Sequence, residues 1–384
     1  MNTILLSIIA TAMLAATPQR NMDDFAFGLY HEINGADPQQ DLFISPFSAG
    51  TALALLNSGA AGTTADEICG MLGFEGTGPK VISAHFRDVT DAIGAADPAT
   101  IFESANSVWV GKNISLKCAY RKNADKFFDA QVSRTDFGDP SSVEAINRWC
   151  SEKTHGKIRE ILDSTDPGIR LMLVNALYFN DAWEFGDFPS VKDEQFNCID
   201  GTKTDNAMMY KTRRFGYSED DNFSMLEIPY GNGSFALYVL LPKDTTATGF
   251  SEASGRLDAA EWENLSSGIR SRQVSLVLPK FKMEYEVELN DALNALGMKE
   301  AFGTGARFPG ISRVPLMVSY VKQKTYLDVN EKGTEAAAVT SIGLRATSVA
   351  PVEIPLEFRA DRPFIFIIRE RTSGEILFIG QKVR

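Results

Sequence analysis

The chain has 384 residues, 44% of them hydrophobic and 23% charged, which is enough to bury a large core. Its formal net charge is −12, and its best basic cluster, residues 211–214, is short and isolated. Neither a nucleic-acid site nor a heparin site is therefore expected. No apolar run reaches the roughly 18 residues that a transmembrane helix needs, so the sequence indicates no membrane partner.

The first residues are typical of an export signal. Residues 4–16 form an apolar run that ends in small residues, and cleavage would fall near Ala15 or Ala16. We therefore expect a signal peptide over residues 1–16 and a secreted protein, extracellular or periplasmic. Residues 1–3 carry no lysine or arginine side chain, so an apolar first helix or a different start site remains the alternative.

Helices and short strands alternate early in the chain. Residues 22–34 have the apolar spacing of an amphipathic helix, and residues 42–48 read as a short strand that Pro46 ends. Ser48 can then cap a helix that runs to about Ser58. Further predicted elements are a turn at 60–64, a helix at 65–71, a strand at 101–110 and a helix at 141–154 that Gly156 ends.

Strands dominate the rest of the chain. Residues 171–179 are almost all apolar, which is typical of a buried central strand. Residues 225–242 read as a hairpin that turns at Gly231-Asn232-Gly233. Further predicted elements are strands at 274–278 and 316–329, a helix at 289–297, an apolar segment at 352–358 and a C-terminal hairpin of residues 364–369 and 375–379.

The four cysteines, Cys69, Cys118, Cys150 and Cys198, are far apart and form no Cys-x-x-Cys pair. This spacing argues against a metal site or a redox motif. Four structural thiols are the favoured interpretation, and Cys150, beside Trp149 in a helical pattern, suits a buried thiol. Disulfides remain the alternative in an exported protein, and the sequence cannot choose among the possible pairings.

The sequence carries no pattern typical of a catalytic centre. A hydrolase needs a nucleophile with a base, and the three histidines, His31, His85 and His155, lie in no known motif. Neither Gly-x-Ser-x-Gly nor His-Glu-x-x-His occurs, and no glycine-rich loop could cradle a phosphate. We therefore expect no enzymatic activity, no cofactor and no metal.

Residues 331–348 follow a clear strand and combine two contrary properties. On a period of two, one face is apolar or hydroxyl-bearing and the other carries the charges, which is the pattern of a strand with one buried face. The run is nevertheless rich in alanine and opened by a glycine, so it makes a poor strand alone. We interpret it as a loop that becomes a strand once a sheet accepts it. The first face holds Thr334, Ala336, Ala338, Thr340, Ile342 and Leu344.

The stretch Glu331-Lys332-Gly333-Thr334-Glu335-Ala336-Ala337-Ala338 resembles the hinge of the reactive-centre loop in inhibitory members of the serpin family. Other segments resemble serpin motifs and occur in the family's order: residues 147–158, residues 175–179 followed by Trp183 and Phe185, and residues 358–366. The resemblance extends from about residue 22 to residue 384.

The resemblance implies an α+β fold with three β-sheets and eight or nine helices, in one domain over residues 20–384, with a reactive-centre loop at about 331–357. It also implies inhibition as a suicide substrate. A serine protease, or alternatively a cysteine protease, cleaves the loop and stays bound as an acyl-enzyme while the loop enters the main sheet. Insertion is expected to begin at the hinge, with Thr334 entering first. A monomer is expected, with polymers possible if one molecule's loop enters another's sheet. A non-inhibitory carrier or chaperone is the alternative, which the small hinge residues disfavour.

The resemblance also assigns site residues. In the family the scissile bond lies fourteen residues past the hinge glycine, which corresponds to Thr347–Ser348 and suits an elastase-like or subtilisin-like protease. The competing bond, Arg345–Ala346, suits a trypsin-like one. Shutter residues that let the sheet open are expected at Ser45, Ser48 and Asn175, and a breach residue under the insertion point at Trp183. Gln323 occupies a position where many relatives have histidine, so little pH gating is expected there. Core packing is the alternative role for all five.

Overall fold

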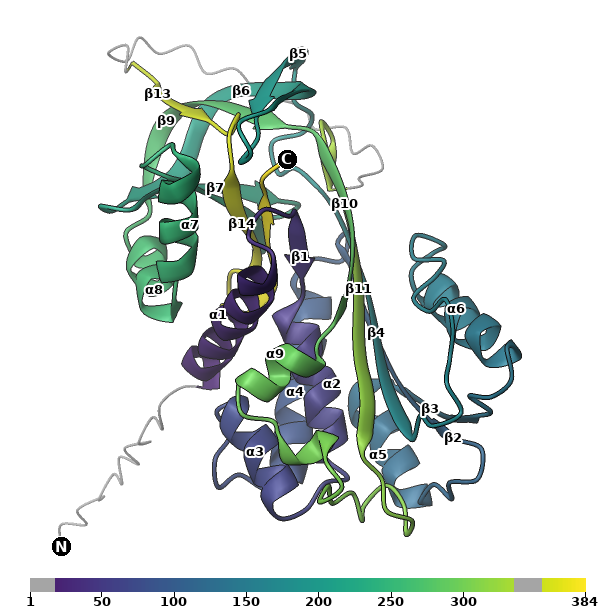
Figure 1. Cartoon of the computed structure of the whole chain (residues 1–384). Coiled ribbons are helices and arrows are strands. Elements are labelled where there is room, and N and C mark those ends of the chain that lie inside the picture. Colours follow the sequence, from purple (N-terminus) through teal and green to yellow (C-terminus); the bar gives the residue numbers. More distant parts are fainter. Residues whose placement is uncertain (1–17, 335–353) are drawn as a thin grey trace, which may run out of the picture.

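The computed structural model describes residues 18–334 and 354–384. Within these residues, a pair of β-sheets packs with nine α-helices (Figure 1). The helices are α1 Pro18–Ala36, α2 Pro46–Asn57, α3 Thr63–Met71, α4 Pro79–Ala96, α5 Cys118–Phe128, α6 Ser141–Lys153, α7 Ala247–Arg256, α8 Ala259–Ser267 and α9 Asn290–Ala295. A short 3₁₀ helix follows at Glu300–Phe302.

The larger sheet has nine strands in the order β1-β15-β14-β8-β7-β6-β9-β13, with β5 paired to β6. Strand β6 pairs with β5 through its first half and with β7 through its last four residues. Strand β6 therefore joins two portions of the larger sheet, and these portions correspond to two of the three sheets expected. The bounds are β1 Leu42–Ile44, β5 Ser190–Asn197, β6 Lys203–Glu219, β7 Phe223–Tyr230, β8 Phe235–Pro242, β9 Arg270–Pro279, β13 Leu356–Arg359, β14 Phe364–Glu370 and β15 Ile376–Lys382.

The smaller sheet has six strands in the order β10-β11-β12-β4-β2-β3. Figure 1 shows α6 on one side of this sheet, apart from the other helices. Successive side chains of β4 point to opposite faces, so Leu173 and Leu177 join the main core while Val174 and Ala176 pack with α6. The bounds are β2 Ile101–Gly111, β3 Gln131–Thr135, β4 Leu171–Ala182, β10 Phe281–Glu288, β11 Val318–Asn330 and β12 Gly333–Thr334.

The start of α2 differs from the prediction. The capping residue is Ser45, whose hydroxyl accepts a hydrogen bond from the Ser48 amide at 3.3 Å, and Ser48 lies inside the helix. The helix begins earlier because Pro46 occupies its first turn, where a fixed φ and a missing N–H are tolerated. Pro46 thus ends β1 and starts α2 at once, and Ser48 becomes free to bond elsewhere.

Four helices, α4, α5, α7 and α8, were absent from the sequence prediction. The signal for α4 was present in Ile82, Phe86 and Ile93, which are buried and recur at helical spacing. Helix α4 contacts β2 and helix α5 contacts β3, so these two helices shape the flank of the smaller sheet.

All four cysteines are free thiols, as favoured from the sequence, although only three are buried and Cys118 is exposed at the start of α5. Among the described helices, none has the length and apolar character needed to cross a bilayer. Residues 18–334 and 354–384 contain no group of three or more candidate metal ligands.

Candidate functional site in the six-stranded sheet

Strands β4 and β11 pair directly along most of their length and separate at one end. Their parallel pairing runs from Val318 opposite Leu171 to Tyr326 opposite Tyr178. Beyond that point β12 lies between them, antiparallel to both. The sheet therefore has a closed region and an open end, and the open end already holds a strand of two residues.

That short strand belongs to the predicted hinge. Thr334 is opposite Asp181 of β4 and Val329 of β11, and its side chain is fully buried. Its hydroxyl lies 2.6 Å from the hydroxyl of Tyr230. From the sequence, Thr334 was expected to enter the sheet first after cleavage. In the intact chain this residue is already in the sheet, so insertion would begin with the residue after it.

Gly333 cannot be replaced by a larger residue without displacing its neighbours. Its φ of +151° is rarely adopted by other residues, and a Cβ atom would lie 2.2 Å from the carbonyl oxygen of Asp181 and 2.7 Å from the Cα of Ala182. A glycine was expected here for its backbone freedom. The structure adds a second reason, because the hinge backbone runs close against β4.

Backbone bonds hold the turn before Gly333 in place. The Phe188 amide donates to the carbonyl of Glu331 at 2.8 Å, and the Trp183 amide donates to the carbonyl of Lys332 at 3.1 Å. The carboxylate of Glu331 lies 2.6 Å from the ammonium of Lys280, whose hydrogen bond lowers the pKa of Glu331. The described residues of the hinge are therefore anchored from both sides.

Trp183 lies beneath the open end of the sheet and is 2% exposed. Its indole N–H donates to the carbonyl of Asn330 at 2.9 Å, at the last residue of β11. Its ring stacks on Tyr230, with centroids 4.6 Å apart and planes 10° apart. The Trp183 side chain thus packs in the core and also anchors the last residue of β11.

Polar side chains gather at the middle of the smaller sheet, where they form what we call the sheet-centre cluster. It brings together the predicted Ser45, Ser48, Asn175 and Gln323, all buried, and adds Asn106 of β2. Gln323 accepts a hydrogen bond from the Ser45 amide at 2.8 Å. It donates to the Ser45 carbonyl at 3.0 Å and to the Asn175 side-chain oxygen at 2.8 Å. One side chain thus bridges β11, β4 and the start of α2.

The cluster continues from Asn175 towards β2. The Asn175 amide donates to the hydroxyl of Ser48 and, at 2.8 Å, to the side-chain oxygen of Asn106. Ser48 also lies 2.5 Å from the hydroxyl of Ser104. Sequence reasoning missed Ser104 and Asn106. The available signal was their spacing of two on a predicted strand, which places both on the face that carries Phe102.

The buried carboxylate of Asp181, beside the hinge, was also missed. Asp181 lies opposite Thr334 and accepts hydrogen bonds from the Thr100 hydroxyl at 2.6 Å and from the Ala182 amide at 2.8 Å. Burial raises the pKa of Asp181 to about 6, and the nearby Asp97 contributes to the rise. A titratable group thus lies at the open end of the sheet, whereas the sequence directed attention to Gln323.

Several predicted site residues lie outside the described residues. They are the remaining hinge residues Glu335, Ala336, Ala337 and Ala338, and the two candidate reactive bonds, Arg345–Ala346 and Thr347–Ser348. The predicted signal segment, residues 1–16, also lies outside them.

Comparison with known proteins gives matches over nearly the whole chain. A family model for serpins, described as serine protease inhibitors, matches residues 20–384. An uncharacterized serpin-like protein of Thermococcus kodakarensis is 34% identical over 368 residues, which cover 94% of this chain and 84% of the relative.

Solved structures agree with this match. A serpin of the insect Tenebrio molitor, described as highly specific, superimposes with a TM-score of 0.86 and 29% identity, covering 97% of this chain and 99% of its own. Human thyroxine-binding globulin, in complex with thyroxine, has a TM-score of 0.87 and 25% identity, covering 96% and 98%. Similar structures therefore include a protein whose name describes the binding of thyroxine.

Proposed function

The chain belongs to the serpin family, and on this premise we propose that it inhibits proteases as a suicide substrate. The hydroxyl of the protease's catalytic serine attacks the carbonyl carbon before the scissile bond. The C–N bond breaks, the new amino group of the following residue takes the proton, and the loop stays esterified to the protease. A cysteine protease would form the corresponding thioester. Insertion of the cleaved loop then distorts the protease before water can release it.

The seated strand β12 carries this proposal, because its register specifies where the rest of the loop would lie. Continuing antiparallel to β4 and β11, each second residue after Thr334 meets the next pair of inward-facing residues. Ala336 falls opposite Phe179 and Leu327, both fully or almost fully buried. The residues that face the core are therefore the small or apolar ones that the period-two pattern predicted.

The same register brings Thr340 between Asn175 and Gln323. Those two side chains are now hydrogen-bonded to each other at 2.8 Å, so the sheet-centre cluster must open for the loop to pass. The threonine hydroxyl can donate and accept in their place. We propose that this exchange is the shutter step, and that it proceeds without leaving a buried polar group unpaired.

Insertion exchanges one strand pairing for two. About ten residues, 335–344, would gain ladders on both sides, while the parallel pairing of β4 with β11 is lost. The net gain is on the order of ten hydrogen bonds at ~0.5–1 kcal/mol each, or roughly 5–10 kcal/mol. That sum is comparable to the whole stability of a typical domain, so the uncut form would be kinetically trapped.

We propose Thr347–Ser348 as the reactive bond and an elastase-like or subtilisin-like protease as the target. In the extended register Leu344 falls opposite Leu171, the first residue of β4. Thr347 would thus lie just past the end of the sheet, so complete insertion of the loop would carry the attached protease to the far end of the molecule. The bond Arg345–Ala346, for a trypsin-like protease, is the competitor. We also propose export through the segment 1–16, so that the target is extracellular or periplasmic.

A non-inhibitory role is the second candidate, because the similar structures include thyroxine-binding globulin in complex with thyroxine. The small residues after Gly333 favour inhibition. A carrier has no need of a loop whose inward-facing residues all fit between β4 and β11.

The test combines a protease panel with thermal unfolding. Inhibition predicts a complex that survives denaturant, release of a C-terminal fragment that begins at Ser348, and a higher unfolding temperature for the cleaved protein. A protease with its catalytic serine blocked is the control, since it forms no ester. A cleaved sample that melts no higher than the intact one would contradict the proposal.

Two variants sharpen this test. Ala336→Arg would have to bury an unpaired charge against Phe179 and Leu327, so it should become a substrate that is cleaved and released. Glu335→Arg is the matched control, because in the same register it falls opposite Asn180 and Asp328, which are partly exposed. This variant should still form complexes at close to the normal ratio.

A further inference from the structure

Strand β2 is paired on both edges along only a fraction of its length. Residues 101–110 pair with β4, whereas β3 pairs only with residues 107–111. Within the described chain, residues 101–106 have no strand on their second edge. Every second residue there directs its N–H and C=O away from β4. Ile101, at the start of this free edge, is 39% exposed although it is apolar.

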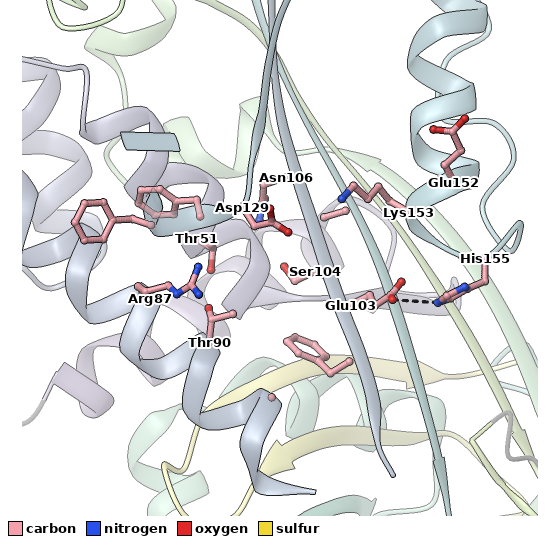
Figure 2. A pocket seen from close by; sticks show the side chains of 15 residues that line it. Thr51, Arg87, Thr90, Glu103, Ser104, Asn106, Asp129, Glu152, Lys153 and His155 are labelled. Carbon is pink, nitrogen blue, oxygen red and sulfur yellow. Dashed lines mark ion pairs between the residues drawn. The ribbon is translucent and has the colours of Figure 1, made fainter. Parts of the chain in front are cut away.

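A cleft of about 460 Å³ follows this edge, and five consecutive residues of β2, 102–106, line it. Figure 2 shows Thr51, Arg87 and Thr90 on one side of β2 and Lys153 and His155 on the other. Because both faces of the sheet are represented, the cleft has the shape of a missing edge strand. One row of that strand's side chains would face the helices α2 and α4, and the other row would face the end of α6.

Asn106 gives independent evidence of an absent partner. Its side chain is 2% exposed and lines the cleft, and its oxygen accepts from Asn175. Its amide nitrogen is buried and has no hydrogen-bond partner within the described residues. A buried donor without an acceptor is rare in folded proteins, and a carbonyl oxygen placed in the cleft would satisfy it.

We propose that this cleft binds a short extended peptide as an added edge strand on residues 101–106 of β2. Main-chain bonds to the free edge would give affinity, and one peptide carbonyl would accept from Asn106. The side chains that face inward should be apolar, because Phe102, Phe127 and Phe128 line that side. The charges around the cleft largely offset one another, which favours an uncharged peptide. Arg87 pairs with Asp91 at 2.8 Å, and His155 lies 3.0 Å from Glu103.

Such a peptide would be connected to the sheet-centre cluster through the hydrogen bonds of β2. Ser104 contacts Ser48, and Asn106 contacts Asn175, which in turn holds Gln323. An added strand wedged between β2 and α4 fixes β2 in its present position, so it opposes the opening of the sheet. This second step rests on the proposed function: the bound peptide slows loop insertion, and more of the protein is cleaved without trapping the protease.

The binding test uses the intact chain and the blocked peptide acetyl-Thr-Leu-Thr-Leu-Thr-amide, measured by calorimetry. The control peptide carries N-methyl groups on alternate amides, which removes the donors that the edge requires. We expect saturable binding of the first peptide and at least tenfold weaker binding of the second. Equal binding of the two peptides, or binding of neither, would overturn the proposal.

Two glycine variants locate the site. Gly94 lies on α4 at the cleft and Gly255 lies on α7, and at both positions an added Cβ meets nothing within 4 Å. Gly94→Trp should fill the cleft and weaken peptide binding at least tenfold, whereas Gly255→Trp should leave it unchanged. A different result would identify a second copy of the chain as the occupant. In that case the chain self-associates, Gly94→Trp abolishes the association, and the peptide does not bind, so the peptide proposal is wrong.

The coupling is tested separately by adding the peptide to a protease that the chain traps. A slower rate of complex formation and more cleaved product support the coupling, and an unchanged rate with saturating peptide contradicts it. Calorimetry needs no protease. If no protease is trapped, the proposed function fails, while the binding result stands by itself.

Discussion

Replacing Gln323 with leucine would remove three hydrogen bonds from the middle of the smaller sheet with little change in side-chain volume. The Ser45 carbonyl keeps a bond from the Ala49 amide at 3.1 Å, but the Ser45 amide and the Asn175 side-chain oxygen lose their bonds to Gln323. Each buried group left unpaired costs about 1–3 kcal/mol. After the apolar gain of the leucine is subtracted, we expect a loss of about 2–4 kcal/mol.

Thermal unfolding at a fixed heating rate measures this loss. The entropy of unfolding for a chain of this length is about 0.8 kcal/mol per kelvin, so the midpoint should fall by about 3–5 °C. Gln195→Leu, at an exposed position on β5, is the control and should shift the midpoint by less than about 1 °C. If the two variants unfold together, Gln323 does not hold the sheet closed and the reasoning fails.

The same variant tests the proposed shutter step. Without the bond between Gln323 and Asn175 the sheet opens at lower cost, so the cleaved loop should insert faster and polymers should form at a lower temperature. Native gels after heating, run beside Gln195→Leu, measure the second effect.

Three further predictions concern the open end of the sheet. Gly333→Ala places a Cβ against the carbonyl of Asp181, so β12 should leave the sheet; faster amide exchange at Thr334 would show this, and unchanged exchange would contradict it. Asp181→Asn should stabilise the protein by about 2–3 kcal/mol at pH 7.5 but by only about 0.5 kcal/mol at pH 4. The pKa of Asp181 is about 6 in the folded state and ordinarily 3.8, so the folded state loses stability as the pH rises between these values. Chemical denaturation of both proteins at the two pH values measures the difference. Thr334→Arg should destabilise the intact chain as well as abolish trapping, because Thr334 is already buried against Tyr230; an intact variant as stable as the parent would refute this.

Local patterns in the sequence were sufficient for much of the fold. The apolar run at 171–179 predicted β4, and the Gly231-Asn232-Gly233 turn predicted the hairpin of β7 and β8. These features depend on neighbouring residues, so composition and spacing reveal them. Where two local signals competed, as at Pro46, the prediction placed the helix cap on Ser48 and the structure places it on Ser45.

The candidate site was only partly predictable, because its contacts join distant segments. Ser45 and Gln323 are 278 residues apart and Tyr230 and Thr334 are 104 apart, and strand register decides that each pair meets. The resemblance to a family supplied four of the cluster's residues. For Asn106 the only local signal was its spacing of two from Ser104, and the buried Asp181 carried no local signal of a role. That Thr334 is seated before any cleavage follows from the divergence of β4 and β11.

By itself, the sequence determined the alternation of side chains after Gly333 and the glycine that precedes it, because alternation and backbone freedom are properties of consecutive residues. The tertiary structure alone decided that Gly333 and Thr334 already lie between β4 and β11, that Gln323 and Asn175 bridge the closed part of the sheet, and which edge of the sheet is left open. Those outcomes depend on how strands far apart in the chain align, and alignment is fixed by packing and hydrogen bonding over the whole sheet.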